Sequence, residues 1–447
     1  MKRWLMSEMS APEEVAASTD YAVSADLAPK GALTVAAFRW LWFNNAFFFI
    51  VLNAQRFAFG WLVLDRLDGD ERTQGIAVFA LGIPALFLVL HAGAWADRND
   101  RKKLLVGSQV ASLAVMALTA AMINVDLISF NIVLVLAVVA GAASAIGQPV
   151  RAALVPALVD RSQLFNAIAV SALAMTASMI LGPVLVQAVG DQFGFAAAFW
   201  FLTSLLVAGL LVLAPLRIPP RPPSEDSHDE TADSSAAEDQ SSDARPSVLT
   251  ETKQAVVHVV GDPALKKLFF LLTVSGLTIM PAVMVSLQAF VKEDLGRDAG
   301  DAAPLLALMG VGIAISSLFL MRKSDMKNKG AAFQRAMMGG GTAVFLMGRT
   351  TEYWQLLPLV FLMGLCGGFY INMNQGLIQA NTPAAMMGRV MGLFTLVAMG
   401  LFPIGALLIG LIASSVGIGA TISGAAAIAL VTVVVTYVTD EDLRYLS

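Results

Sequence analysis

The amino-acid sequence predicts an all-α membrane protein whose twelve transmembrane helices form two pseudo-symmetric six-helix bundles. The first observation behind this prediction is the set of long apolar runs that make up most of the chain. Of its 447 residues 57% are apolar and only 14% are charged, with a mean hydropathy of +0.72, whereas soluble domains carry about 25% charged residues. The stretch 390–438 contains no charged residue. Because a bilayer core of about 30 Å needs about 20 apolar residues per spanning helix, these runs have the right length to cross it.

Each run is expected to be a helix, because backbone groups in lipid must bond to one another and only helices and closed barrels achieve this. Barrel strands alternate apolar and polar residues, whereas these runs are continuously apolar. The expected helices cover residues 36–64, 73–95, 104–124, 127–147, 163–189, 195–213, 264–291, 302–321, 330–348, 354–379, 387–414 and 416–438.

The second observation is that three landmarks occur twice at nearly the same spacing. Asp97 and Asp325 are 228 residues apart, Pro156 and Pro383 are 227 apart, and Pro183 and Pro403 are 220 apart. Both members of each pair occupy the same place relative to the expected helices. We therefore expect two parallel repeats related by an axis along the membrane normal.

The chain divides into five parts on this basis. Residues 1–35 form a cytosolic extension, because Lys2 and Arg3 are not followed by the apolar segment of a signal peptide. Residues 36–214 and 263–438 form the two bundles, and 439–447 a short cytosolic tail. Residues 215–262 join the bundles and are rich in Ser, Asp, Glu, Ala and Pro, so they cannot bury enough apolar surface to fold alone. We interpret them as a flexible acidic linker; a regulatory loop is the alternative.

Basic residues in the short loops predict the orientation, because cytosolic loops carry the excess of Lys and Arg. The loops on one side hold basic residues at 98, 101–103, 151, 161, 322, 323, 327, 329, 335 and 389, and those on the other side only at 66, 72, 292, 297 and 349. With an even number of helices, both termini are expected in the cytosol of a bacterial-type cell, with the protein in its inner membrane.

The strongest local motif lies between the second and third expected helices. Gly93, Asp97, Arg98, Arg101 and Lys102 match the loop motif G-x-x-x-D-R-x-G-R-R/K of the major facilitator superfamily, which this chain resembles. Asp100 stands where the motif has its second glycine. The resemblance implies the major facilitator fold and a latch in which Asp97 holds helix two against the start of helix eleven. In this chain that start contains Arg389.

Glycine and proline inside the expected helices narrow the resemblance further. Gly182 and Pro183 look like part of the antiporter motif of drug exporters, and Pro281 and Pro403 interrupt helices seven and eleven. An ordinary kink is the alternative to a hinge at these positions. Together with the segments 148–156 and 388–393, they resemble the exporter branch that includes siderophore and macrolide efflux proteins.

The resemblance also implies a central substrate cavity lined by helices one, four, seven and ten. Polar residues in spanning helices are costly and usually face the interior. The candidates are Asn45, Phe49, Asn53, Arg56, Ser144, Gln148, Thr278, Met284, Gln288, Tyr370, Asn374 and Gln375. Two interpretations of Arg56 stay open, anion binding in the cavity and snorkelling to the outer interface. Amides and one phenol among apolar walls suit an amphipathic ligand.

Energy coupling has little support in the residues themselves, because no Asp or Glu lies in the middle of a run. The candidates for a proton site are His91 and Asp97. Proton coupling is what the resemblance implies, and a facilitator or substrate-driven exchanger stays open.

The sequence therefore predicts a secondary transporter that exports an amphipathic organic small molecule by alternating access. The alternatives are an uptake permease for a neutral polar nutrient and a non-transporting sensor or scaffold. An enzyme is not expected, because the sequence contains no G-x-S-x-G, H-E-x-x-H or P-loop motif. Three scattered histidines and one cysteine support no metal site. We expect no cofactor, no nucleic-acid partner and a monomer in the lipid bilayer.

Overall fold

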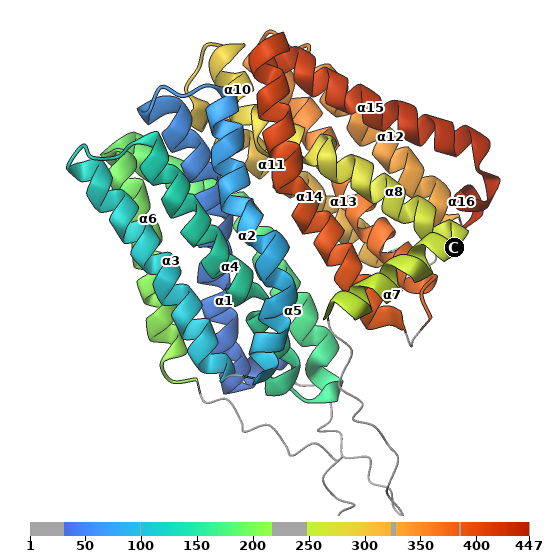
Figure 1. The fold of residues 1–447 in the computed structure, drawn as a ribbon, viewed down its shortest axis with the longest axis horizontal. Coiled ribbons are helices and arrows are strands. Elements are labelled where there is room, and N and C mark those ends of the chain that lie inside the picture. The colour runs from blue at the N-terminus through green and yellow to red at the C-terminus, as the bar shows by residue number, and fades with distance from the viewer. Residues whose placement is uncertain (1–30, 99, 217–247, 323–327, 384–385, 447) are drawn as a thin grey trace, which may run out of the picture.

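The computed structural model describes residues 31–98, 100–216, 248–322, 328–383 and 386–446, and within these the side chains of 89–98, 161, 162, 165, 248, 249 and 321 are not described. The described residues fold into helices and connecting turns, without strands. Figure 1 shows two helical bundles side by side. The all-α fold predicted from the apolar runs is confirmed.

The first bundle follows the short 3₁₀ turn η1, Ala32–Thr34. Its helices are α1, Ala36–Trp61, which continues as the π turn η2, Leu62–Arg66; α2, Glu71–Arg98; α3, Arg101–Asn124; α4, Phe130–Leu158; α5, Arg161–Phe193; and α6, Phe195–Leu213.

The second bundle begins with α7, Val248–Gly261. The helices that follow are α8, Pro263–Leu277; α9, Ile279–Met284; α10, Ser286–Glu293; α11, Ala302–Arg322, after the turn η4, Ala299–Asp301; α12, Lys329–Met347; α13, Tyr353–Ala380; α14, Met387–Val416; α15, Ile418–Thr439; and α16, Glu441–Tyr445.

Ten helical segments among the described residues are long and apolar enough to cross a membrane. Helices α2 and α12 are not among these ten. Helix α2 packs against α4 of its own bundle and α14 of the other, and α12 packs against α13 and α15 of its own bundle. Large side chains such as Leu211, Val135 and Val431 are exposed on the outside of the bundles. In a soluble protein such exposure would be a liability, whereas in a bilayer it is the surface that contacts lipid.

Within each bundle, helices approach closely at glycines. A Cβ on Gly141 in α4 would overlap the carbonyl oxygen of Leu81 in α2, and a Cβ on Gly364 in α13 would overlap that of Met309 in α11. These two contacts occupy equivalent places in the two bundles. Gly182 in α5, against α1, and Gly405 in α14, against α8, form a second equivalent pair. The repeated contacts agree with the duplication expected from the sequence.

The two bundles meet through α2 against α14 and α5 against α11. Gly75 packs on Gly410, and Gly82 packs on Pro403. Gly75 and Gly82 lie in the first half of α2, and Pro403 and Gly410 in the second half of α14. In Figure 1 these two helices are farther apart at their lower ends than at their upper ends. Near the lower end of α14, Gly388 and Gly392 have open space where a Cβ would lie.

Helix α4 is longer than the sequence suggests, because it runs through Pro149 and Pro156 to Leu158 instead of ending near residue 147. Proline is tolerated in a membrane bundle where neighbouring groups satisfy the freed carbonyls. Conversely, the single helix expected at 264–291 is divided at Thr278 and Val285. Pro281 lies in the short middle segment, and its ring is incompatible with a regular bond to the carbonyl of residue 277.

Helix α7 lies inside the segment that the sequence analysis treats as a linker. Its Ala255 and Val259 are buried one turn apart, while Val257 and Val260 are exposed. The helix packs against α8 and α14. Residues 217–247, the acidic part of the predicted linker, lie outside the described residues.

Replacing Gly364 with alanine should destabilise the protein, because the added Cβ meets the Met309 carbonyl and overpacking costs about 1–3 kcal/mol. Gly376 in the same helix has nothing within 4 Å, so Gly376→Ala should be neutral or stabilising by up to about 1 kcal/mol. Thermal unfolding in detergent, followed by tryptophan fluorescence, checks both. Equal midpoints for the two variants would contradict this packing.

Candidate functional site

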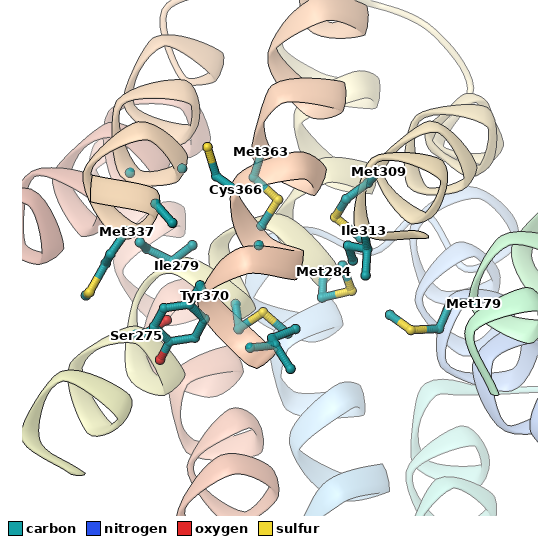
Figure 2. Close-up of a pocket in the computed structure, with 16 residues that line it drawn as sticks. Met179, Ser275, Ile279, Met284, Met309, Ile313, Met337, Met363, Cys366 and Tyr370 are labelled. Carbon is teal, nitrogen blue, oxygen red and sulfur yellow. The ribbon is translucent and has the colours of Figure 1, made fainter. Parts of the chain in front are cut away.

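A pocket opens among α8, α9, α11, α12 and α13 of the second bundle (Figure 2). Six methionines line it, so we call it the methionine pocket; these are Met179, Met280, Met284, Met309, Met337 and Met363. Met179 alone comes from the first bundle, on α5. The pocket exists because α8 and α9 are separated by the break at Thr278, which turns Met280 and Met284 toward α11 and α13.

The methionine pocket has few polar groups. Tyr370 lies at one side of it, its ring stacked on Phe333 with centroids 5.4 Å apart, and Ser275 faces its hydroxyl group. Cys366, the single cysteine of the chain, also lines the wall and is half-buried. Flexible thioether side chains adapt to ligands of different shape and contact aromatic rings favourably. The pocket therefore suits an apolar group next to one hydroxyl handle.

Arg56 on α1 faces the space between the bundles. Protein surrounds it, yet its side chain has exposed surface, which is the combination expected at an internal cavity. Two contacts locate it. One turn before it, Asn53 donates a hydrogen bond to Ser178 of α5 at 3.0 Å. One turn after it, Gly60 packs against the side chain of Gln288. No hydrogen bond or ion pair to Arg56 is present among the described residues.

At the upper end in Figure 1 the two bundles are joined by polar contacts that we call the lock, made by Trp61, Asp65, Gln74, Gln288 and Lys292. The amide of Gln288 accepts a hydrogen bond from Gln74 at 2.8 Å and donates one to the Phe57 carbonyl oxygen at 3.0 Å. It thereby ties α10 to both α1 and α2. This side chain closes the space above Arg56.

The charged part of the lock centres on Asp65. Its carboxylate accepts hydrogen bonds from the Trp61 indole at 2.8 Å and from the backbone N–H of Ala299 at 3.1 Å, and it lies 3.5 Å from the Lys292 ammonium. Lys292 also donates to the Leu64 carbonyl oxygen. Ala299 and Lys292 belong to the second bundle, so these bonds hold the bundles together at this end.

A second polar cluster lies inside the first bundle and was missed by the sequence analysis. Arg151 is 2% exposed and donates to Asn44, to Asn45 at 2.9 Å and to Gln109 at 3.1 Å, with its guanidinium 3.8 Å above the Phe48 ring. No carboxylate partner of Arg151 is among the described residues. The sequence analysis placed Arg151 in a cytosolic loop; this is wrong because α4 continues past Pro149. The signal that could have found it is the set of Asn and Gln residues on the facing helices.

Replacing Arg151 with lysine should lower stability by about 1–3 kcal/mol, because an ammonium cannot keep all three amide bonds and the ring contact, and buried acceptors are left unpaired. Arg349→Lys, at an exposed arginine, should change little. Denaturant or thermal unfolding in detergent measures the difference; unfolding midpoints that coincide for the two variants would refute the structural role.

The predicted site residues are distributed over these features. Met284 and Tyr370 line the methionine pocket, and Arg56 faces the central space. Gln288 belongs to the lock. Asn45 is a partner of Arg151, Ser144 accepts from Gln55 at 3.2 Å, and Asn374 is 1% exposed with neither amide atom bonded among the described residues. Phe49, Gln148, Thr278 and Gln375 are half-buried and lie outside the pocket lining.

The predicted gating motif is only partly described. The side chains of His91, Gly93, Asp97 and Arg98 lie outside the described residues. Asp100 caps α3 by accepting bonds from the backbone N–H groups of Lys102 and Lys103, which explains an aspartate at the motif's second glycine. Arg101 donates to the Ala153 carbonyl at 3.3 Å, and Lys102 to the Leu216 carbonyl at 2.5 Å. Both cations thus lie at helix C-termini, where the dipole favours them.

At the other predicted partner of this gate, Arg389 contacts the sulfur of Met386 at 3.6 Å. The predicted hinge residues lie at helix contacts: Gly182 and Pro183 are buried between α5 and α1, Pro281 contacts Gly405, and Pro403 contacts Gly82. The latch between Asp97 and Arg389 stays a prediction.

Comparisons with known proteins agree with this architecture. The family model of the Major Facilitator Superfamily matches residues 41–402. Enterobactin exporter EntS of Shigella boydii serotype 4 (strain Sb227) is 25% identical over 330 residues, 72% of each chain. Multidrug efflux pump Tap of Mycolicibacterium fortuitum is 24% identical over 382 residues, 81% of this chain and 86% of its own length. The solved structure of the POT family transporter PepTSo superposes with a TM-score of 0.68 at 12% identity, over 92% of this chain and 99% of its own.

The family expected from the loop motif is therefore confirmed, and the exporter resemblance agrees with the relatives found. With its two helical bundles and apolar outer surface, this chain belongs to the major facilitator superfamily of membrane transporters and is not an enzyme.

Proposed function

We propose that this protein exports an amphipathic organic small molecule across the inner membrane by alternating access. The observation that carries the proposal is the methionine pocket, an apolar and adaptable cavity with one hydroxyl handle beside the space between the bundles. Such a lining binds apolar groups of varied shape. The efflux activities named for the relatives EntS and Tap support the direction of transport.

In the proposed orientation, the end with Arg101 and Lys102 faces the cytosol and the lock faces outside. Counting α2 and α12 as spans then makes twelve, with both termini in the cytosol. The conformation is inward-facing, because the lock is closed while α2 and α14 diverge at the opposite end. Substrate would enter from the cytosol or inner leaflet, bind in the methionine pocket, and leave after the lock opens.

Filling the pocket tests this directly. Gly367 lines the pocket and has no neighbour within 4 Å, so the ring of Gly367→Phe would occupy the cavity. Gly376, with equally open surroundings, lies on the opposite face of the same helix, so Gly376→Phe is the matched control. In proteoliposomes loaded with a panel of fluorescent amphiphiles, we expect transport by the wild type and Gly376→Phe and at least a tenfold loss in Gly367→Phe.

The same proteoliposomes test the remaining parts of the proposal. Transport that is faster with an imposed pH gradient supports proton exchange, and transport insensitive to it indicates substrate-driven exchange or facilitation. If neutral polar nutrients are carried and amphiphiles are not, the protein is an uptake permease. No transport of any compound by the folded wild-type protein would favour a sensor or scaffold.

Weakening the lock should expose the pocket to the outside. Each lost neutral hydrogen bond is worth about 1 kcal/mol, so Gln288→Ala should shift the equilibrium toward the open lock by about fivefold or more, and Gln288→Ala with Lys292→Ala further. The single Cys366 provides the measurement, as the rate of its modification in whole cells by a membrane-impermeant thiol reagent. The control is Arg349→Ala, a cation at the same end that stacks on Phe345 of its own bundle. Unchanged rates in the double variant would refute the lock.

A further inference from the structure

Arg56 is the charged side chain that the fold and the lock leave unexplained. It lies in the span Ala36–Arg66, and no acidic group among the described residues neutralises it. An unpaired cation away from bulk water is unfavourable and is retained mainly where it binds something. Arg151, the other arginine inside the first bundle, has three amide partners and a ring. Arg56 has no amide or ring partner of this kind among the described residues.

Snorkelling to the outer surface does not explain Arg56 in this conformation. Gly60, one turn further along α1, packs directly against Gln288, which bonds to Gln74 and to the Phe57 carbonyl oxygen. The closed lock therefore lies between Arg56 and that end of the bundle. With the lock on one side, we assign the exposed surface of Arg56 to the internal space on the other side of the lock.

The same two contacts place Arg56 beside the methionine pocket. Asn53, one turn before it, bonds to Ser178, and the next residue of α5 is Met179, which lines the pocket. Gly60, one turn after it, touches Gln288 of α10, and Met284, the last residue of α9 before the break at Val285, also lines the pocket. Arg56 does not line the pocket itself, but a turn rises about 5.4 Å, so its long side chain can extend from this position toward the edge of the pocket.

The arrangement of sulfur atoms favours an organic ligand over a metal ion. In Figure 2 the side chains of Met179, Met284, Met309, Met363 and Cys366 are spread along the wall of the pocket and do not converge on a point. A soft metal ion would need converging sulfur ligands. Thioethers spread over a wall instead suit aromatic rings, with which each contact is worth about 0.3–1.5 kcal/mol.

We propose that the substrate is an aromatic amphiphile that carries an anionic group, with its rings in the methionine pocket and its carboxylate, sulfonate or phenolate oxygen bound by Arg56. This deepens the proposed function and rests on it for the identity of the pocket. The guanidinium provides two parallel donors to such an anion, and the bond is strong because the lock excludes water from one side. Neutral analogues bind the pocket alone, and cationic ones are disfavoured by Arg56.

Two fluorescent compounds with the same aromatic body test this proposal. These are 8-anilinonaphthalene-1-sulfonate, which is anionic, and N-phenyl-1-naphthylamine, which is neutral. The readout is protection of Cys366 from methyl methanethiosulfonate in the purified protein, because that thiol lines the pocket. The variants are Arg56→Gln, Arg56→Lys and the control Arg349→Gln, which removes an exposed arginine that follows α12 and does not line the pocket. Each probe partitions into detergent to the same extent with every variant, so this partition cancels when a variant is compared with the wild type for the same probe.

In the wild type and Arg349→Gln, we expect the sulfonate to protect at a concentration at least tenfold lower than the neutral compound. Arg56→Gln should lose this preference while keeping protection by the neutral compound, and Arg56→Lys should keep part of it. Equal protection by both compounds in the wild type, or an undiminished preference in Arg56→Gln, overturns the proposal. If Arg56→Gln does not fold, the result for Arg56→Lys decides: a retained preference supports the proposal and a lost one overturns it.

This design tests the anion site and the exporter function separately, so a failure of one can be told from a failure of the other. A sulfonate preference that depends on Arg56, without transport in proteoliposomes, would leave the anion site standing and remove the exporter. Transport of both compounds at equal rates by the wild type and Arg56→Gln would leave the exporter standing and remove the anion site.

Discussion

Close contact of helix backbones at small residues is the constraint on which the rest of this structure depends. In a bilayer, lipid tails are as apolar as side chains, so helices associate through tight packing instead of hydrophobic burial. Gly141 against Leu81 and Gly364 against Met309 provide that packing in the two bundles, and Gly75 against Gly410 provides it between them. Each contact involves a backbone carbonyl or Cα that cannot move aside. The bundles are therefore stiff, and changes of conformation are confined to the surfaces where they meet.

The two bundles differ in what fills their interiors. Arg151 and Gln109 in the first bundle are separated from Asn374 and Gln334 in the second by 223 and 225 residues, so they occupy equivalent positions. In the first bundle the arginine, with Asn44, Asn45 and Gln109, forms a bonded cluster. In the second, both amide atoms of Asn374 and the Gln334 carbonyl oxygen lack partners among the described residues, and the methionine pocket lies close by along α12 and α13. The interior of the first bundle is thus filled by bonded side chains, whereas the second bundle holds the pocket, although the two bundles share one arrangement of helices.

The fold followed from the sequence because length and apolarity alone decide which segments cross a bilayer. The loop motif added the family, and α6 begins and ends where expected. Contacts between side chains could not be predicted in the same way. Gln288 was expected in the cavity, and it bonds to Gln74 because the break at Val285 rotates α10 relative to α9. Arg151 was placed in a loop because prolines at 149 and 156 suggested one, and the amides that accept its bonds come from helices distant in sequence. Met284 and Tyr370 line the methionine pocket, and their role in binding substrate stays a prediction.

The composition of the lock limits how strongly the closed state is favoured. The ion pair of Lys292 with Asp65 is mostly buried and contributes little net stability, because the cost of desolvating both charges offsets their attraction, and the neutral bonds of Gln288 contribute about 1 kcal/mol each. All of these bonds join the same two bundles at one end, so they break together when the bundles rotate. A few kcal/mol is within the range that a ligand supplies when it binds one conformation better than the other. A much stronger lock would trap the conformation in which the lock is closed, and a bare apolar contact would not close this end against water. The mixed set of amides and one weak ion pair meets both requirements.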